Sequence, residues 1–464
     1  MGTNEKRAQR ANYNRWGLSQ FLNSSSTSTV DPFLPIFARS LGATPVDVGI
    51  LAGIFSLVSI SQLLWASFAE RAQKHRSLVF LGRLLVALLY LPMILLKHGQ
   101  IMILWILRFF QGVFASATAP TEISLMNEYI PAQRRTKILP WLTQLGLIGT
   151  ILGTLLGGLL FTSLTAEIRL SEELAFGILF VWTAVLGIAS SLLFLTAISQ
   201  EKGAPLSPES LILQRINVPS QLGVFAKAKA YFRAFDNFWW FCLFAAVFNF
   251  GTHFAAPFFI IIQIESYDLT LFEAGIMTAI ATSCQVSVLI VQRRYDFIRK
   301  VGTRNMLFPA LLLISLSTFA VAIPYYFEKM PILLWLAVSW IFLGLGWGIF
   351  NSTLIILLLD ILHPRYRATL VAIYNTIIGI VMFFAPVLGG LLVISTNIAS
   401  VFVFRSVIIL LAMILVIRIK DPEIPGTLLL PTRNVVLKHF RTLSGRGREA
   451  LVVYARRKPR NGIE

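Results

Sequence analysis

The hydrophobic and polar positions along this chain alternate on a scale of about 20 residues, the length of helix that crosses a bilayer. Apolar runs of that kind number twelve and are separated by polar connections: 17–39, 46–68, 78–96, 101–123, 138–163, 175–197, 237–263, 271–291, 305–326, 332–359, 368–394 and 400–419. The pattern predicts an all-α membrane protein with twelve transmembrane helices. Composition agrees, because 56% of the 464 residues are hydrophobic and 13% are charged, about half the charged share of soluble domains.

The placement of basic residues orients the expected helices. The first 16 residues and every second connection hold 22 of the 40 Lys and Arg residues, and the tail after residue 419 holds ten more. Because cytoplasmic loops are enriched in Lys and Arg, this asymmetry predicts a protein of the cytoplasmic membrane with both termini inside. It accounts for the net charge of +18 without nucleic acid, and we expect the basic tail to contact anionic lipid.

The longest internal connection divides the apolar runs into two sets of six. We therefore expect a cytoplasmic N-tail (1–16), a six-helix bundle (17–197), a linker with an interfacial helix (198–236), a second six-helix bundle (237–419) and a basic C-tail (420–464).

The two halves also repeat each other in sequence. "PAQRRTK" from residue 131 parallels "PRYRATL" from residue 364, with Arg134 and Arg367 at an offset of 233. Pro32 and Pro257 align at an offset of 225. Parallel six-span repeats are a transporter architecture, in which the substrate site lies at the interface of the halves.

No enzymatic site is predicted. The sequence has no histidine cluster for a metal, no nucleophile elbow and no phosphate-binding loop. Its two cysteines, Cys242 and Cys284, lie in separate apolar runs, so we expect neither a disulfide framework nor a metal site of the usual spacing. We expect no cofactor, and a gradient rather than bound ATP as the energy source.

Several short motifs resemble those of the major facilitator superfamily. "RFFQGVFASA", from Arg108 to Ala117, fits the family's Arg-x-x-Gln-Gly pattern in the fourth span. "GTILGTLLGG" (149–158) resembles the antiporter motif of the fifth span, but Thr154 stands at its proline position. The resemblance implies the family's fold, two six-helix bundles that work by alternating access.

The same resemblance implies a set of cytoplasmic gate residues. "ASFAERAQKH" (66–75) resembles the family's charged motif between the second and third spans, "YDFIRKVGTRN" (295–305) is its counterpart in the second half, and "NEYIPAQRR" (127–135) resembles the loop after the fourth span. The expected gate residues are Glu70, Arg71, Glu128, Arg134, Asp296, Arg304, Asp360 and Arg367.

Few charged residues lie within the apolar runs, where each costs about 2.5–3.5 kcal/mol without a partner. Asp31 and Arg108 each lie about eight residues, or ~12 Å, below the outer end of their helices. The resemblance implies that both helices line the central cavity, so we expect the two side chains to pair. A carboxylate beside an arginine stays charged until the pair is disrupted and then takes up a proton more readily, which outlines a coupling mechanism.

Two more titratable groups are candidates for transport. Glu122 follows Arg108 by 14 residues, which places both on nearly the same face of a helix; it either lines the pathway or extends to the cytoplasmic surface. His253 titrates near neutral pH if it is accessible, although a buried histidine bonded to a carbonyl is the more common case. We expect Arg83 and Arg405 to extend along their helices to the membrane surface.

Polar side chains at mid-span are the candidates for contact with substrate. Gln20, Ser24, Thr27 and Asp31 recur at helical spacing in the first run and form one polar stripe, whereas the small hydroxyls of Ser25, Ser26, Ser28 and Thr29 suit close helix packing. The full set of expected cavity residues is Gln20, Ser24, Thr27, Gln111, Gln144, Asn249, Gln285, Asn351 and Asn375. Hydrogen bonds between helices explain those after the first run equally well.

These observations predict a monomeric secondary transporter of a small solute. Proton-coupled efflux of an amphipathic solute is the leading expectation. A symporter or uniporter for an organic anion that Arg108 binds directly is an alternative of the same class. A transport-inactive scaffold or assembly factor that holds a partner with its basic tail is an alternative of another class.

Overall fold

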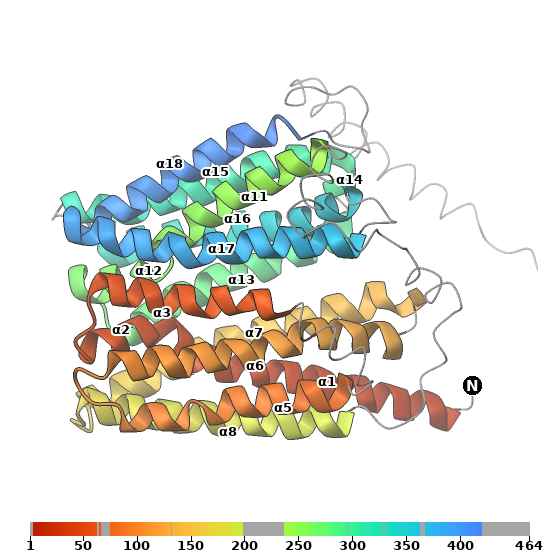
Figure 1. Ribbon diagram of the computed structural model, residues 1–464, viewed down its shortest axis with the longest axis horizontal. Coiled ribbons are helices and arrows are strands. Elements are labelled where there is room, and N and C mark those ends of the chain that lie inside the picture. The colour runs from red at the N-terminus through yellow and green to blue at the C-terminus, as the bar shows by residue number, and fades with distance from the viewer. Residues whose placement is uncertain are drawn as a thin grey trace, which may run out of the picture.

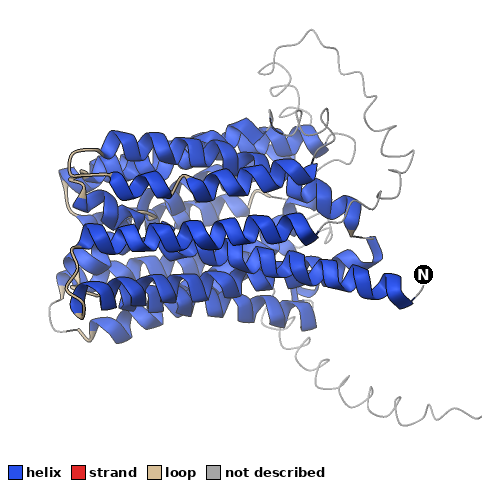
Figure 2. Cartoon of the chain, turned by 90° about the horizontal axis from the view of Figure 1, so that it is seen from below, coloured by secondary structure: helices blue, strands red, loops and turns tan. Residues whose placement is uncertain are grey.

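The computed structural model describes residues 3–62, 65, 75–130, 132–197, 236–295, 297–327, 330–361 and 367–419. Within these ranges every regular element is a helix (Figure 2), as the sequence predicts. The linker between residues 198 and 235, with its expected interfacial helix, and the basic tail from 420 to 464 lie outside the described residues.

The elements form two layers, with α1 to α8 below and α11 to α18 above (Figure 1). The first half contains α1 (Thr3–Val30), η1 (Asp31–Phe33), α2 (Leu34–Ser40), α3 (Pro45–Leu57), η2 (Val58–Ser61), α5 (His75–Leu88), η3 (Leu91–Leu95), α6 (Ile101–Tyr129), α7 (Ala132–Ala166) and α8 (Glu172–Ala197). The second half contains α11 (Asp236–Ala255), α12 (Phe258–Ile261), the π-helical turn η5 (Ile262–Ser266), α13 (Leu271–Tyr295), α14 (Phe297–Val301), α15 (Thr303–Ala322), η6 (Ile323–Tyr326), α16 (Ile332–Ile361), α17 (Arg367–Ser395) and α18 (Ile398–Val416).

Within the described residues, ten helical segments are long and apolar enough to cross a membrane, and they correspond to the third to twelfth expected spans. The second expected span contains α3, which is apolar but has only 13 residues before η2. The first expected span lies in α1, which is not among these ten segments: it starts at Thr3, earlier than expected, and continues without a break through the polar N-terminal residues.

Both halves interrupt their first helix at the aligned prolines. α1 ends at Val30 and gives way to the 3₁₀ turn that contains Pro32. α11 ends at Ala255, and Pro257 precedes the short α12 and its π-helical turn. Proline lacks an N–H and its ring clashes with the preceding turn, so a continuous helix is disfavoured at both places. The interruptions bring irregular backbone to the interface between the halves, which is tolerated inside a membrane only where protein or a cavity surrounds it.

Glycines at every fourth position of α7 allow that helix to lie directly against α1. A Cβ added at Gly149, Gly153 or Gly157 would collide with a backbone oxygen of α1. Ser25 and Thr29 are buried in this contact, and the Thr29 hydroxyl donates to the Ser25 carbonyl at 2.8 Å. Ser25 and Thr29, two of the four small hydroxyl residues, therefore lie in a close helix contact, and the "GTILGTLLGG" segment is the surface on which they pack.

The two halves meet tightly at one end of the bundle, which we call the distal end. It carries the connections 41–44, 97–100, 167–171, 267–270 and 396–397 and lies opposite the N-terminus (Figure 2). Gly49 on α3 packs against the backbone of Pro386 on α17, and Gly158 on α7 packs against Leu271 at the start of α13. The halves are therefore closed against each other on the side that the basic residues predict to be external.

An ion pair also joins the halves at the distal end. Arg39 Nε lies 2.9 Å from Glu265 Oε1, and a second bond joins Arg39 Nη2 to the other carboxylate oxygen at 3.3 Å. Both side chains are partly exposed, so the pair contributes little to the free energy of unfolding. Its position, from α2 to the turn after α12, nevertheless makes it part of the contact that must separate when the distal end opens.

The close contact between α7 and α1 is tested by adding one methyl group. Gly153→Ala places that methyl against the Ser25 carbonyl, and overpacking of this kind costs about 1–3 kcal/mol. We expect the apparent melting temperature of the detergent-purified protein, followed by tryptophan fluorescence, to fall by several degrees. Gly177→Ala is the matched control, because a Cβ there meets only Ile94 Cγ2 at 3.4 Å. Equal melting temperatures for the two variants would contradict this packing role.

Candidate functional site

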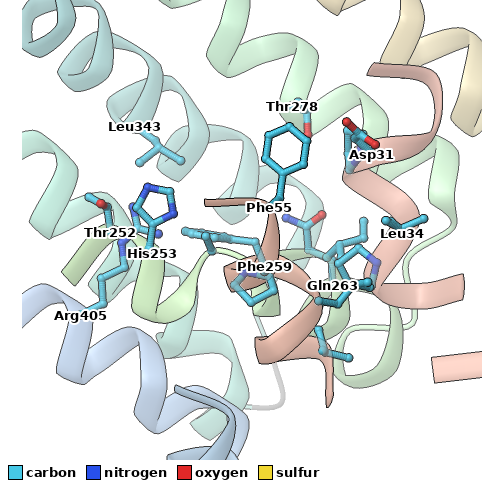
Figure 3. Close-up of a pocket in the computed structure, with 18 of the residues that line it drawn as sticks. Asp31, Leu34, Phe55, Thr252, His253, Phe259, Gln263, Thr278, Leu343 and Arg405 are labelled. Carbon is cyan, nitrogen blue, oxygen red and sulfur yellow. The ribbon is translucent and has the colours of Figure 1, made fainter. Parts of the chain in front are cut away.

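A cavity of about 490 Å³ lies between the two halves (Figure 3). Its walls are mainly aromatic and aliphatic, and they come from η1, α2 and α3 on one side and from α11, α12 and α16 on the other. Apart from two indoles, the polar side chains in its wall are Asp31, Arg108, Thr252, His253, Gln263, Thr278 and Arg405. A mostly apolar cavity of this size with a few polar groups is typical of small-molecule sites.

Asp31 accepts two hydrogen bonds at the start of η1. Arg108 Nη1 on α6 donates to Asp31 Oδ1 at 3.0 Å, and the Tyr90 hydroxyl donates to the same oxygen at 2.8 Å. Arg108 Nη1 also donates to Gln111 Oε1 at 2.8 Å, so the arginine is held from one turn further along α6. The expected contact between Asp31 and Arg108 is therefore present, and its use in transport is a proposal made below.

The Asp31 carboxylate keeps one side accessible. Its side chain is 34% exposed, compared with 11% for Arg108. Both hydrogen bonds reach Oδ1, and no residue in the described part of the chain donates to Oδ2. A proton can therefore reach Oδ2 without first displacing Tyr90 or Arg108.

A second buried ion pair joins α5 to α6 further from the distal end. Arg83 Nη2 lies 2.8 Å from Glu122 Oε2. The same guanidinium donates to Ser19 and Gln20 on α1, and the indole of Trp16 donates to the other oxygen of Glu122. Every charged group in this cluster has a partner, which is the condition under which a buried ion pair is tolerated.

A smaller cavity of about 130 Å³ extends from one ion pair to the other inside the first half. Asp31 and Arg108 line one end of it, and Arg83 and Glu122 line the other. The remaining polar wall residues are Gln20, Asn23, Thr27, Tyr90 and Thr118. A polar space of this volume holds several water molecules. Because Asp31 and Arg108 also line the large cavity, their pair forms part of the wall between the two spaces.

Arg405, on α18, is the cation that the second half contributes. Its side chain is 2% exposed, and its Cζ lies 4.7 Å from the centre of the Phe259 ring. Among the residues that the structure describes, no carboxylate lies within ion-pair distance of Arg405, and its Nε has no acceptor. Thr252 and His253 lie beside it, across the cavity from Asp31 (Figure 3).

The positions of Arg83 and Arg405 correct the sequence-based expectation that both extend to the membrane surface. Both are buried inside their own bundles. Arg83 finds acceptors on α1 and α6, and Arg405 reaches the cavity and a phenylalanine ring. An apolar run shows where an arginine lies along its helix, but it does not show which acceptors or aromatic rings the neighbouring helices place beside the guanidinium.

Most of the side chains expected to contact substrate lie elsewhere. Asp31, Arg108 and His253 line the large cavity and Glu122 lines the small one, as do Gln20 and Thr27. The other expected residues, namely Ser24, Gln111, Gln144, Asn249, Gln285, Asn351 and Asn375, line neither cavity. Gln111 positions Arg108, and the Asn249 amide donates to the Ala245 carbonyl one turn earlier on α11.

The expected gate residues are mostly outside the described part of the chain. Glu70, Arg71 and Asp296 are not described, and neither are the side chains of Glu128, Arg134, Asp360 and Arg367. Arg304 on α15 is buried and donates at 3.4 Å to the carbonyl of Ile419, which lies three residues after the end of α18.

Several residues of the large cavity were not predicted. Gln263 carried a usable signal, because it is the one amide in the apolar run "APFFIIIQI" and follows the aligned proline. It is 1% exposed, and its Nε2 has no acceptor among the described residues. Phe55, Phe259, Trp340 and Trp347 gave no such signal, because aromatic residues within apolar runs are usually core or lipid-facing.

Comparisons with known proteins agree with this arrangement. A family model described as the Major Facilitator Superfamily matches residues 16–355 and 297–455. No curated protein matches the chain. Among solved structures, a bacterial homolog to the human lysosomal transporter Spinster, in an inward-facing and occupied conformation, has 14% sequence identity and a TM-score of 0.61, over 90% of this chain and 96% of that one.

Two further structures share the fold. The nucleoside transporter NupG has 14% identity and a TM-score of 0.66, over 88% of this chain and 100% of that one. The human organic anion transporter MFSD10 has 15% identity and a TM-score of 0.58, over 88% and 99%. At these identities the likeness shows the fold alone. The family model, however, covers well over half of the residues, and the chain belongs to the major facilitator superfamily, whose members are secondary transporters of small solutes rather than enzymes.

Proposed function

We propose that this chain is a proton-coupled secondary transporter of the cytoplasmic membrane, with both termini inside, and that Asp31 is the group that binds the proton. The observation that carries the proposal is the Asp31–Arg108 pair, which lines both the cavity between the halves and the polar cavity inside the first half. A proton and a solute that enter these two spaces meet at one side chain.

The ion pair supplies the physical basis for coupling. While Asp31 is charged, it neutralises Arg108, and the pair is stable in a surrounding of low dielectric constant. A proton on Asp31 leaves Arg108 without its counter-charge and changes the charge of the cavity wall by one unit. A solute whose affinity depends on that charge, or a conformational change that separates the pair, is thereby linked to proton binding.

The small cavity provides the proton pathway in this proposal. It leads from Asp31 to Glu122, which lies on α6, 14 residues after Arg108 and nearer the cytoplasmic end of that helix. Water in this space connects the two carboxylates by hydrogen bonds. The large cavity is then reserved for the solute, and the closed distal end separates both spaces from the outside in this conformation.

The direction of transport depends on how the solute and Asp31 interact. Export, the leading expectation from the sequence, requires a solute that takes the place of the proton at Asp31, such as an amphipathic cation. The alternative, an organic-anion symporter, requires a solute that binds together with the proton. One observation favours this alternative: Arg108 and Arg405 both line the cavity, whereas Asp31 is the only carboxylate among the described residues that do.

Replacement of the proton-binding group tests the proposal. In proteoliposomes with an internal pH dye, we expect wild-type protein to move protons when a transported solute from a panel is added. We expect Asp31→Asn to abolish that proton movement but to retain exchange of labelled solute for unlabelled solute, because the cavity remains. Asp268→Asn is the matched control, since Asp268 is exposed in a distal turn at φ 51°, a backbone conformation that asparagine accepts.

Two outcomes would contradict the proposed function. Solute-driven proton movement at the wild-type rate by Asp31→Asn would remove Asp31 from the coupling mechanism. No exchange of any solute by folded wild-type protein would instead support the transport-inactive scaffold.

A space-filling substitution tests the proton pathway. Ala115 lines the small cavity between the two ion pairs, so Ala115→Leu removes room for water there. We expect this variant to transport solute in response to a pH gradient several-fold more slowly, whereas solute exchange in the absence of a gradient stays close to the wild-type rate. Ala115→Ser, which keeps the space open and polar, is the matched control. An equal loss of gradient-driven transport and exchange in Ala115→Leu would argue against a separate proton pathway.

A further inference from the structure

We propose that the large cavity binds a small organic anion with an apolar body, and that Arg405 is the residue that binds its negative group. The inference rests on the proposed transport function for its biological role, because it names the class of solute that the cavity accepts. The residues that carry it belong mainly to the second half, which the proton-coupling proposal does not use.

Among the charged groups that the structure describes around the cavity, one cation has no carboxylate partner. Arg108 is paired with Asp31 at 3.0 Å. Arg405 is almost fully buried, lines the cavity, and has no carboxylate within ion-pair distance in the part of the chain that the structure describes. A buried charge without a partner is costly, and such residues within membrane spans are retained at functional sites. A ligand anion is the counter-charge that no described residue supplies.

The uncharged polar groups of the cavity are also suited to an anion. Gln263 Nε2 and Trp340 Nε1 are buried donors in the cavity-lining side chains, and neither has an acceptor among the described residues. Small adjustments of these side chains let them donate to a ligand oxygen. The Thr252 hydroxyl beside Arg405 donates to the Asn249 carbonyl at 3.1 Å, and it donates to a ligand oxygen only after it turns away from that carbonyl.

The rest of the cavity wall defines the body of the ligand. Phe259 already lies over the guanidinium of Arg405, and Phe55 lies over that of Arg108 at 5.0 Å. The rings of Trp340 and Trp347 and aliphatic side chains from α2, α3 and α16 complete the wall. An aromatic or branched aliphatic body fits these surfaces, and its single negative group then lies at the Arg405 side (Figure 3). A cation of the same size binds less well, because the described cavity wall has two arginines and one carboxylate.

The position of Asp31 predicts how proton and anion binding are linked. The titratable and charged groups that face the cavity in the described residues are Asp31, Arg108, His253 and Arg405, and Tyr90 contacts Asp31 from behind. When Asp31 is protonated, Arg108 is released from its ion pair and adds a second positive charge to the anion site. A proton and an organic anion therefore favour each other's binding, which corresponds to symport. By linkage, the affinity for the anion rises as the pH falls through the range in which Asp31 becomes protonated.

Binding in detergent tests the charge of the ligand without requiring transport. The probes are 2-naphthoate, 2-naphthamide and 2-naphthylmethylammonium, which share one apolar body and carry a negative, zero and positive charge. We expect 2-naphthoate to raise the apparent melting temperature of the wild-type protein in a non-ionic detergent, because a ligand that binds only the folded state stabilises it. Equal or greater stabilisation by the amide or the ammonium compound would overturn the assignment. Loss of the naphthoate effect on addition of phosphatidylglycerol would show that a lipid head group, not a soluble anion, occupies the site.

Substitution of Arg405 tests the residue. We expect Arg405→Gln to weaken binding of 2-naphthoate roughly tenfold to 100-fold, the usual loss for a charge-assisted hydrogen bond. Arg418→Gln is the matched control, because Arg418 follows the same helix and is exposed. A structural role would lower the melting temperature of Arg405→Gln in the absence of ligand. Our proposal predicts an unchanged or higher value, because the variant removes an unpaired buried charge.

The pH dependence separates Asp31 from His253 as the linked group. We expect wild-type and His253→Gln protein to bind 2-naphthoate more tightly as the pH is lowered, and Asp31→Asn to bind it tightly at every pH. Loss of the pH dependence in His253→Gln, or its persistence in Asp31→Asn, would contradict the linkage. Anion binding at Arg405 without solute-driven proton movement would refute the proposed proton coupling and leave the anion site standing. Proton-coupled transport that stays unchanged in Arg405→Gln would refute the anion site and leave the proposed proton coupling standing.

Discussion

A charge buried in a membrane-spanning bundle needs a partner, and the distribution of partners organises this transporter. Even lenient scales assign about 2.5–3.5 kcal/mol to an unpaired charge at the centre of a bilayer. Arg83 meets this condition with Glu122, and Arg108 meets it with Asp31. Arg405 meets it only through a phenylalanine ring in the described structure. In the proposed mechanism, the two ion pairs belong to the proton pathway, and Arg405, which has no carboxylate partner among the described residues, belongs to the solute site.

The helix packing holds these charges where they are. The interruptions at Pro32 and Pro257 lie in the first helix of each half, where polar side chains next to them line the interface between the halves. The glycines of α7 bring α1 close enough for the Asp31 region to be fixed against the rest of its bundle. Contacts at the distal end then close the halves over the cavity, and the partly exposed Arg39–Glu265 pair adds only a weak, separable bond to that closure. The glycine contacts between α3 and α17 and between α7 and α13 are as close as those within a half, so they must separate when the distal end opens.

Those features that depend on position along a single helix were predictable from the sequence. The apolar runs gave ten of the twelve spans. The equal depths of Asp31 and Arg108, together with the family resemblance that places both helices at the cavity, gave their contact. The aligned prolines indicated the repeat, and the structure shows in addition that the first helix of each half is interrupted there. In contrast, the burial and the partners of Arg83 and Arg405 depend on which face of a neighbouring helix is polar, and the sequence of a single run does not contain that information. The same reason explains why Gln144, Asn351 and Asn375, polar and near mid-span, line neither cavity, whereas Phe55 and Trp340 do line the larger one.

In the proposed mechanism, an anion in the large cavity and a proton on Asp31 stabilise each other. Infrared difference spectroscopy of the purified protein, recorded on addition of 2-naphthoate at constant pH, measures this most directly, because a protonated carboxylic acid has a carbonyl stretch distinct from that of a carboxylate. We expect the anion to induce the band of a protonated carboxylic acid in wild-type protein and not in Asp31→Asn. The same spectrum in both proteins, or binding of the anion without any carboxyl protonation, would contradict the linkage between the anion and the proton on Asp31.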